Sequence, residues 1–78
     1  MSTRVQNENK FGQWEELPGG GRRYRLEVRG RLGWVAYYLK EVDASEGTLR
    51  FWQEVYDETG KLVETLEKFP VDKGHQKV

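Results

Sequence analysis

Hydrophobic and polar residues alternate most regularly in the segment RRYRLEVR, residues 22–29. Successive side chains of a β-strand point to opposite faces, so this alternation predicts a strand with Tyr24, Leu26 and Val28 on its buried face. The other face would carry Glu27 and the arginines. Three further segments are rich in the β-branched and aromatic residues that strands favour, namely 34–42, 49–56 and 61–69.

Short segments with turn residues separate these predicted strands. GRLG (30–33) suits a tight hairpin, DASEGT (43–48) is typical of a loop, and DETG (57–60) is a turn signal. The predicted strands 49–56 and 61–69 also show the apolar spacing of a short helix. A four-residue turn between two segments of matched length nevertheless favours a hairpin. We therefore predict a mainly β fold: an antiparallel meander of four to five strands that forms a curled sheet or a small open barrel.

The ends of the chain lack this alternation. Residues 1–10 are polar and aperiodic, which is typical of a flexible arm. Apolar residues at every third position of 11–17 fit one short helical turn, with a strand as the alternative, and PGGG then ends the element. Because Pro70 ends the last predicted strand, we expect one small β domain over residues 11–70 and a C-terminal tail at 71–78.

The turns also predict which residues pair. A hairpin closed by residues 30–33 sets Arg29 opposite Trp34 and Leu26 opposite Tyr37, which brings apolar side chains together on one face.

A loop at residues 57–60 sets Arg50 opposite Glu67 and Phe51 opposite Leu66 in the second hairpin. We favour this loop because a loop one residue shorter would place like charges opposite each other. Four strands cannot cover their own core, so the N-terminal element, a curl of the sheet or a second copy of the chain must do so. A homodimer is one of the arrangements that we expect.

The net charge and its distribution along the chain limit the kinds of molecule that the protein could bind. The chain has 13 basic and 13 acidic residues, and it is therefore neutral overall, but residues 1–39 carry +3 and residues 40–78 carry −3. A neutral domain lacks the strong field of a dedicated nucleic-acid protein. The two halves could attract each other within one molecule or between two copies.

The strongest candidate site is the predicted face on which arginines lie among aromatic side chains. Its members are Arg23, Arg25, Arg29, Trp34, Tyr38, Arg50, Trp52 and Tyr56. Arginine and aromatic residues are enriched at protein interfaces, and they also bind phosphates and stack on unpaired bases. A solvated face with internal cation–π pairs is the third interpretation. We favour a non-catalytic binding or assembly module with a protein partner or a second copy, with nucleic acid as a less favoured ligand.

Candidate catalytic residues are few. The chain has no cysteine and one histidine, so neither a thiol nucleophile nor a multi-histidine metal site can form, and no cofactor motif is present. His75 with Lys73 could support acid–base cleavage of RNA, which makes a small ribonuclease-type toxin or a toxin–antitoxin component the alternative function. The lack of cysteine, of a signal peptide and of a long apolar segment predicts a cytoplasmic protein without a membrane partner.

Overall fold

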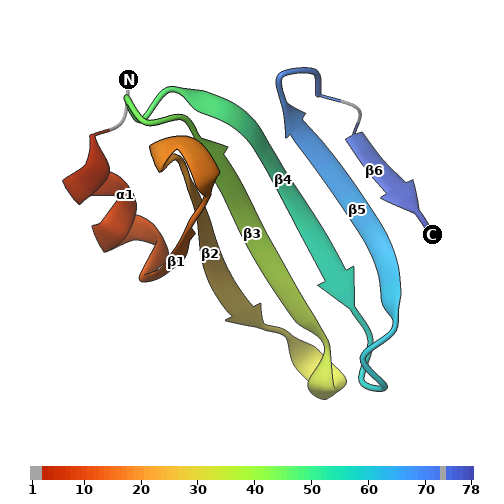
Figure 1. Ribbon diagram of the computed structural model, residues 1–78. Coiled ribbons are helices and arrows are strands. Elements are labelled where there is room, and N and C mark those ends of the chain that lie inside the picture. Colours follow the sequence, from red (N-terminus) through yellow and green to blue (C-terminus); the bar gives the residue numbers. More distant parts are fainter. Residues whose placement is uncertain (1–2, 73) are drawn as a thin grey trace.

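The computed structural model describes residues 3–72 and 74–78, which form one open antiparallel sheet and one short helix (Figure 1). The elements are α1 (Arg4–Phe11), β1 (Gln13–Glu16), β2 (Arg22–Arg29), β3 (Val35–Val42), β4 (Thr48–Tyr56), β5 (Leu62–Phe69) and β6 (Gly74–Lys77). The six strands lie in the sheet in sequence order. The predicted mainly β meander is thus confirmed, with short strands β1 and β6 added at the two edges.

Helix α1 lies in the segment for which the sequence predicted a flexible arm. Thr3 caps the helix by accepting a hydrogen bond from the backbone N–H of Gln6, while the Gln6 side chain accepts one from the backbone of Thr3. Gly12 ends the helix in the left-handed conformation, with φ = 79°. The capping residues Thr3 and Gly12 mark the two ends of the helix. The segment is so polar that hydrophobic periodicity could not predict it. Residues 13–16 then form a strand, which was the alternative to a helical turn.

The C-terminal segment also contributes to the sheet. β6 pairs with β5, for example Leu66 with His75, within the segment that the sequence placed in a tail. Residues 49–56 and 61–69, for which a helix was the alternative, lie in strands β4 and β5 as predicted.

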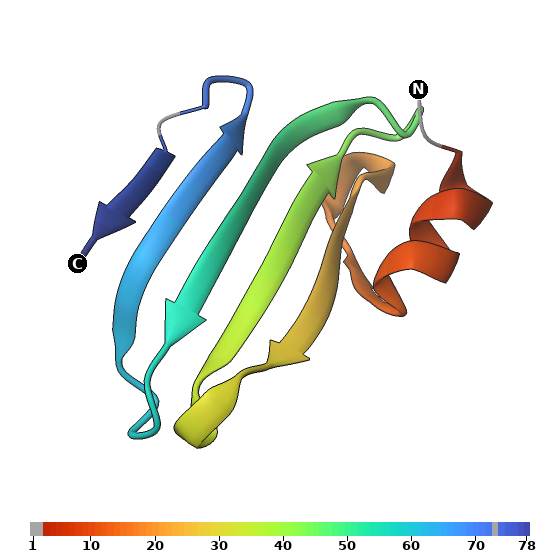
Figure 2. The same cartoon turned by 180° about the vertical axis from the view of Figure 1, so that it is seen from behind.

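The core lies between α1 and one face of the sheet, here called the helix face. Phe11 of α1 packs against Tyr24 and Phe51, with ring centroids 5.7 and 6.3 Å apart, and Val42 completes the buried cluster. Figures 1 and 2 show that α1 covers one end of the sheet, beside β1 and β2, while the β2–β3 hairpin projects beyond it. A substantial part of the helix face is therefore left without a covering layer in the described chain.

The predicted register of the first hairpin is wrong by one residue. Arg29 pairs with Val35 rather than with Trp34, and Leu26 pairs with Tyr38 rather than with Tyr37. The tight turn is not centred on residues 31–32 but on 32–33, where both residues have positive φ, and Trp34 N–H donates to Arg31 O at 3.0 Å. Because side chains alternate along a strand, this one-residue shift moves each side chain of β3 to the opposite face.

The predicted register of the second hairpin is also wrong. Trp52, and not Arg50, pairs with Glu67, and Phe51 pairs with Phe69 rather than with Leu66. The first cause is the loop, which has three residues, 58–60, rather than four, since Asp57 N–H donates to Lys61 O at 2.9 Å and Tyr56 pairs with Leu62. In addition, two irregularities in the β4–β5 ladder, one next to Tyr56 and one next to Phe51, each insert a residue in β5. The alternation of the sequence carries no sign of these bulges.

In the described part of the chain, no helix is long and apolar enough to cross a membrane. The cytoplasmic location stays a prediction.

Candidate functional site

The structure divides the eight predicted binding residues between the two faces of the sheet. Six of them share the face opposite α1, here called the arginine face: Arg23, Arg25, Arg29, Arg50, Trp52 and Tyr56. Trp34 and Tyr38 belong to the helix face instead, because of the register shift in β3. Tyr37 and Leu39 take their places beside the arginines.

The arginines at the two sides of this face pair with carboxylates of neighbouring strands. Arg23 Nε lies 2.7 Å from Glu41 Oε2, and its Nη1 contacts Glu15. Arg50 Nη2 lies 2.8 Å from Glu67 Oε1, so these two residues form an ion pair, although they are not the directly opposed pair that the sequence predicted. Arg23 donates a hydrogen bond to Glu41 and Arg50 donates to Glu67, and these hydrogen bonds raise the pKa of the two guanidinium groups. Carboxylates therefore neutralise Arg23 and Arg50, two of the positive charges that would bind a phosphate backbone.

Arg25 differs from these residues because its hydrogen-bond partner is neutral. Its Nη2 donates to Gln13 Oε1 at 2.8 Å, and its guanidinium carbon lies 5.3 Å from the centroid of the Tyr37 ring. Arg25 therefore forms a cation–π pair within this face, of the kind that the sequence suggested, with Tyr37 as its partner.

Trp52 is buried rather than available to a ligand. Only 6% of its surface is exposed, the guanidinium of Arg50 covers the ring at 3.9 Å, and the indole N–H donates to Glu54 at 3.0 Å. The hydroxyl of Tyr56 donates to the same carboxylate at 2.9 Å, and this hydrogen bond, together with burial, raises the pKa of Tyr56. These contacts make Trp52 part of the packing of the arginine face.

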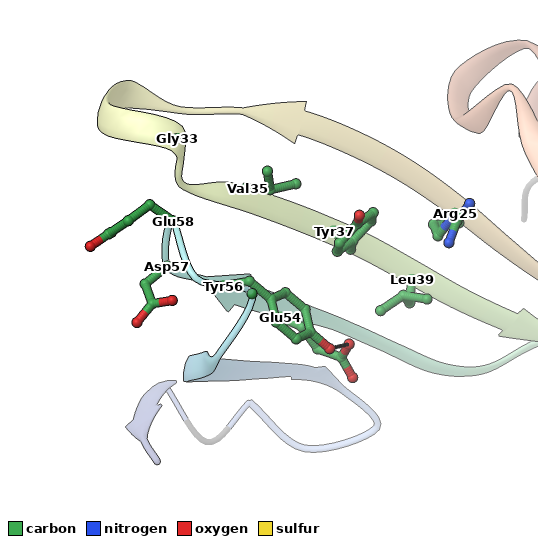
Figure 3. A pocket seen from close by; sticks show the side chains of 10 residues that line it. Arg25, Gly33, Val35, Tyr37, Leu39, Glu54, Tyr56, Asp57 and Glu58 are labelled. Atoms are coloured by element: carbon green, nitrogen blue, oxygen red, sulfur yellow. Dashed lines mark hydrogen bonds between the residues drawn. The ribbon is translucent and has the colours of Figure 1, made fainter.

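A pocket of about 510 Å³ opens on this face between β3 and β4 (Figure 3). Arg25, Tyr37 and Leu39 line one side, and Glu54 and Tyr56 line the other. The rings of Tyr37 and Tyr56 meet edge to face with centroids 5.7 Å apart. The acidic β4–β5 turn closes one end of the pocket, opposite Arg25, so the lining is polar at both ends.

A second concave surface, on the helix face, has a different character. This apolar patch lies at the end of the sheet that α1 does not cover, and has a volume of about 460 Å³. It consists of Val28, Leu32, Trp34, Ala36, Tyr38 and Val55. Val28 and Trp34 are 43% and 40% exposed. Arg31 is the charged residue that lines the patch, and in the described chain no carboxylate forms an ion pair with it.

Leu32 is the most exposed member of the patch, at 87%. It stands at the tip of the β2–β3 hairpin with φ = 59° and ψ = 27°, in the left-handed region. This conformation costs a residue with a Cβ about 1–2 kcal/mol. A large apolar side chain at the tip gains little from packing within the described chain, so neither its conformation nor its exposure stabilises the isolated fold.

A buried polar cluster ties α1 to the loop before β4. The carboxylate of Glu46 accepts hydrogen bonds from Arg4 Nε at 2.9 Å, from Asn7 Nδ2 at 2.8 Å and from Tyr24 Oη at 2.8 Å. Burial would raise the pKa of Glu46, but these three hydrogen bonds outweigh it and lower the pKa below its ordinary value. The cluster has a structural role, because hydrogen bonds from α1 and from β2 to this one carboxylate hold the helix against the sheet.

The predicted catalytic pair receives no support from the geometry. Lys73 lies outside the described residues. His75 is on the exposed edge strand β6, where Nδ1 contacts Glu64 Oε1, and it lines neither of the two pockets described above. Among the described residues, no three His, Asp or Glu side chains are grouped so that they could hold a metal ion.

No protein-family model matches the sequence, and neither the curated proteins nor the solved structures contain a significant match.

Two features of the structure could not be predicted from the sequence. Leu32 stands in a segment that reads as a turn, where only the following glycine indicates that φ is positive. Glu46 stands in a polar loop, and its partners Asn7 and Tyr24 are far away in the sequence, so no spacing rule connects them.

Proposed function

We propose that the protein is a non-catalytic interaction module that docks another protein on the apolar patch. The observation that carries this proposal is Leu32, a largely exposed side chain held in an unfavourable backbone conformation at the rim of an apolar pocket. A partner that covers Leu32 would gain the burial that the isolated chain does not provide, at about 25 cal/mol for each Å² of apolar surface removed from water.

The chemistry of the patch defines the partner. Trp34 and Tyr38 offer aromatic surface next to the aliphatic side chains of Val28 and Val55, an arrangement that fits an uncharged apolar segment. Arg31 lies at the rim, so an acidic residue next to that apolar segment would complement its charge.

The geometry favours this patch over the arginine face. Arg23 and Arg50 already pair with carboxylates, and Trp52 is covered by Arg50. A phosphate backbone would have to displace Glu41 and Glu67. Nucleic acid is therefore a competing outcome of the test rather than a second proposal, and the ribonuclease alternative stays a prediction.

The proposal can be tested with Leu32→Asn. Asparagine adopts the left-handed conformation readily, so the variant should be at least as stable as the wild type while it loses the apolar contact. A protein captured from the source cells on the wild type should be identified and purified, and its affinity measured by titration calorimetry. We expect Leu32→Asn to weaken binding at least tenfold.

The matched control is Leu49→Asn, because Leu49 is also exposed but does not line the patch. Its affinity for the partner should equal that of the wild type. The proposal is wrong if Leu32→Asn and Leu49→Asn bind equally well. It is also wrong if Arg25→Glu abolishes partner binding while Leu32→Asn does not, since this result would assign the site to the arginine face.

A further inference from the structure

In the part of the chain that the structure describes, half of strand β2 has a free edge. β1 pairs only with the first four residues of β2, up to Arg25, although β2 continues to Arg29. Figure 2 shows the second half of β2 running past the end of β1. Val28 is 43% exposed and the side chain of Arg29 81% exposed, so this edge is open to solvent. An unpaired strand edge is a template for pairing with another strand.

Hydrogen bonds at the ends of β2 show which backbone groups point outward. Leu17 N–H donates to Gly21 O at 2.9 Å, so position 21 faces β1, whereas Gly30 N–H donates to Trp34 O at 2.7 Å, so position 30 faces β3. Alternate residues of an antiparallel strand direct their backbone groups to opposite neighbours. The N–H and C=O groups of Glu27 and Arg29 therefore face the free edge.

We propose that two copies of the chain associate by antiparallel pairing of these free edges, with Glu27 of each copy opposite Arg29 of the other. Val28 then lies on the two-fold axis, opposite its own counterpart. The backbone groups of Glu27 and Arg29 form the hydrogen-bonded pairs of this register, and the Val28 pair is a non-hydrogen-bonded one.

Charge and space select this register. A two-fold pairing keeps each side chain on its own face only when it is centred on a residue, so centres at Leu26, Glu27, Val28 and Arg29 compete. Centres at Glu27 or Arg29 set like charges directly opposite each other, which is unfavourable. A centre at Leu26 requires the edge of Arg25, which Gln13 of β1 already occupies. The centre at Val28 remains, with an opposite-charge pair on each side.

The side chains on both faces fit this arrangement. On the arginine face, Arg29 now pairs with Glu27 of its own strand at 3.2 Å, and in the dimer it also reaches Glu27 of the second copy. On the helix face, Leu26 lies opposite Gly30 of the second copy, which has no side chain to obstruct it. The two apolar patches become neighbours on one continuous face, so the dimer would present a symmetric docking surface.

Charge reversal tests the register. We expect the wild type to shift from a 9.2 kDa monomer towards twice that mass with rising concentration in sedimentation equilibrium. Glu27→Arg alone and Arg29→Glu alone should each stay monomeric, because each sets like charges opposite each other. An equimolar mixture of the two variants should restore association as a heterodimer. Lys61→Glu, an exposed charge reversal in the β4–β5 turn, should leave the dimer intact.

Cross-linking tests the position of the axis. The chain has no cysteine, so Val28→Cys introduces a single thiol on the proposed two-fold axis, in a non-hydrogen-bonded pair whose Cα atoms are about 4.5 Å apart. This spacing allows a disulfide, and oxidation should give a covalent dimer. Ala36→Cys is the control, because Ala36 pairs with Val28 on the same face but one strand further from the axis.

Three results would overturn the dimer: a monomeric wild type at the highest soluble concentration, no association in the mixture of charge-reversed variants, or equally fast cross-linking of Ala36→Cys and Val28→Cys. This inference is independent of partner docking, since Leu32→Asn should leave the dimer unchanged. Loss of the dimer without loss of partner binding would reject only this inference.

Discussion

The hydroxyl of Tyr24 donates a 2.8 Å hydrogen bond to Glu46 Oε2 at the buried junction between the sheet and α1. Asn7 donates to the same oxygen from the helix, and Arg4 donates to the other oxygen. One carboxylate thus joins α1, β2 and the loop before β4. The charge of Glu46 is therefore coupled to the docking of the helix.

We predict that stability falls in acid because of Glu46. Its pKa is lowered in the folded protein, so its contribution is fully present above the ordinary glutamate pKa and is lost as the pH falls through the lowered folded value. Glu46→Gln should be less stable at neutral pH, by about 1–3 kcal/mol, because a neutral amide is a poorer acceptor for three donors. Urea unfolding from pH 7 to pH 2 should show the difference between the proteins shrinking towards acid. A constant difference would contradict the prediction.

Asn7 should contribute more to the stability of the fold than Asn9 of the same helix. Its side chain donates to Glu46 and accepts a hydrogen bond from Lys40 Nζ at 3.0 Å, and it is buried. Asn7→Ala leaves a buried carboxylate without one of its donors, and we expect a loss of about 1–3 kcal/mol in the free energy of unfolding. The control is Asn9→Ala, at an exposed position of the same helix, which should change stability little. Equal effects of the two substitutions would show that the cluster does not hold the helix.

Gly21 is required by the close approach of β3, and not by its conformation, which is extended. A Cβ at this position would lie 2.5 Å from the carbonyl oxygen of Val42. Gly21→Ala should therefore force the two strands apart and cost about 1–3 kcal/mol, as measured by chemical denaturation. Ser45→Ala, at an exposed position in the nearby loop, is the comparison. Unchanged stability of Gly21→Ala would mean that β3 can move away at no cost.

Arg50 should shield Trp52 from solvent. Its guanidinium lies 3.9 Å from the ring centroid, and its ion pair with Glu67 holds it there. In a background with Trp14→Phe and Trp34→Phe, Arg50→Ala should shift Trp52 emission to longer wavelength and increase its quenching by acrylamide. We expect a loss of about 0.5–1 kcal/mol in stability from the cation–π contact. Arg31→Ala is the control and should leave Trp52 emission unchanged.

The positions of strands β2 to β5 could be predicted from the sequence, whereas strand β6 and the faces of β3 could not. The alternation in β2 correctly places Tyr24, Leu26 and Val28 on the core side. The tight turn lies one residue later than GRLG suggests, because Leu32 adopts a conformation that its residue type disfavours. Because side chains alternate between the two faces along a strand, this displacement of one residue moves every side chain of β3 to the opposite face.

The candidate site was only partly predictable for the same reason. Arg23, Arg25 and Arg29 do share a face, since they alternate along one strand, and Arg50 joins them through the pairing of β4 with β3. Trp34 and Tyr38 do not join them, since their placement depends on the register of β3. The capping of α1 and the docking of Asn7 on Glu46 depend on contacts between distant segments, which hydrophobic patterning does not report.

The order of the strands also bears on how the chain folds. Each strand pairs with the strand that precedes it in the sequence, so most contacts close short loops, and the entropy cost of each closure is small. During synthesis, β2 and β3 can pair before β5 has left the ribosome. Helix α1 cannot complete its contacts with the sheet until Glu46 has left the ribosome. We therefore expect the helix to dock after the β2–β3 hairpin has formed. Pulsed hydrogen exchange should show β2 and β3 protected before the amides of α1.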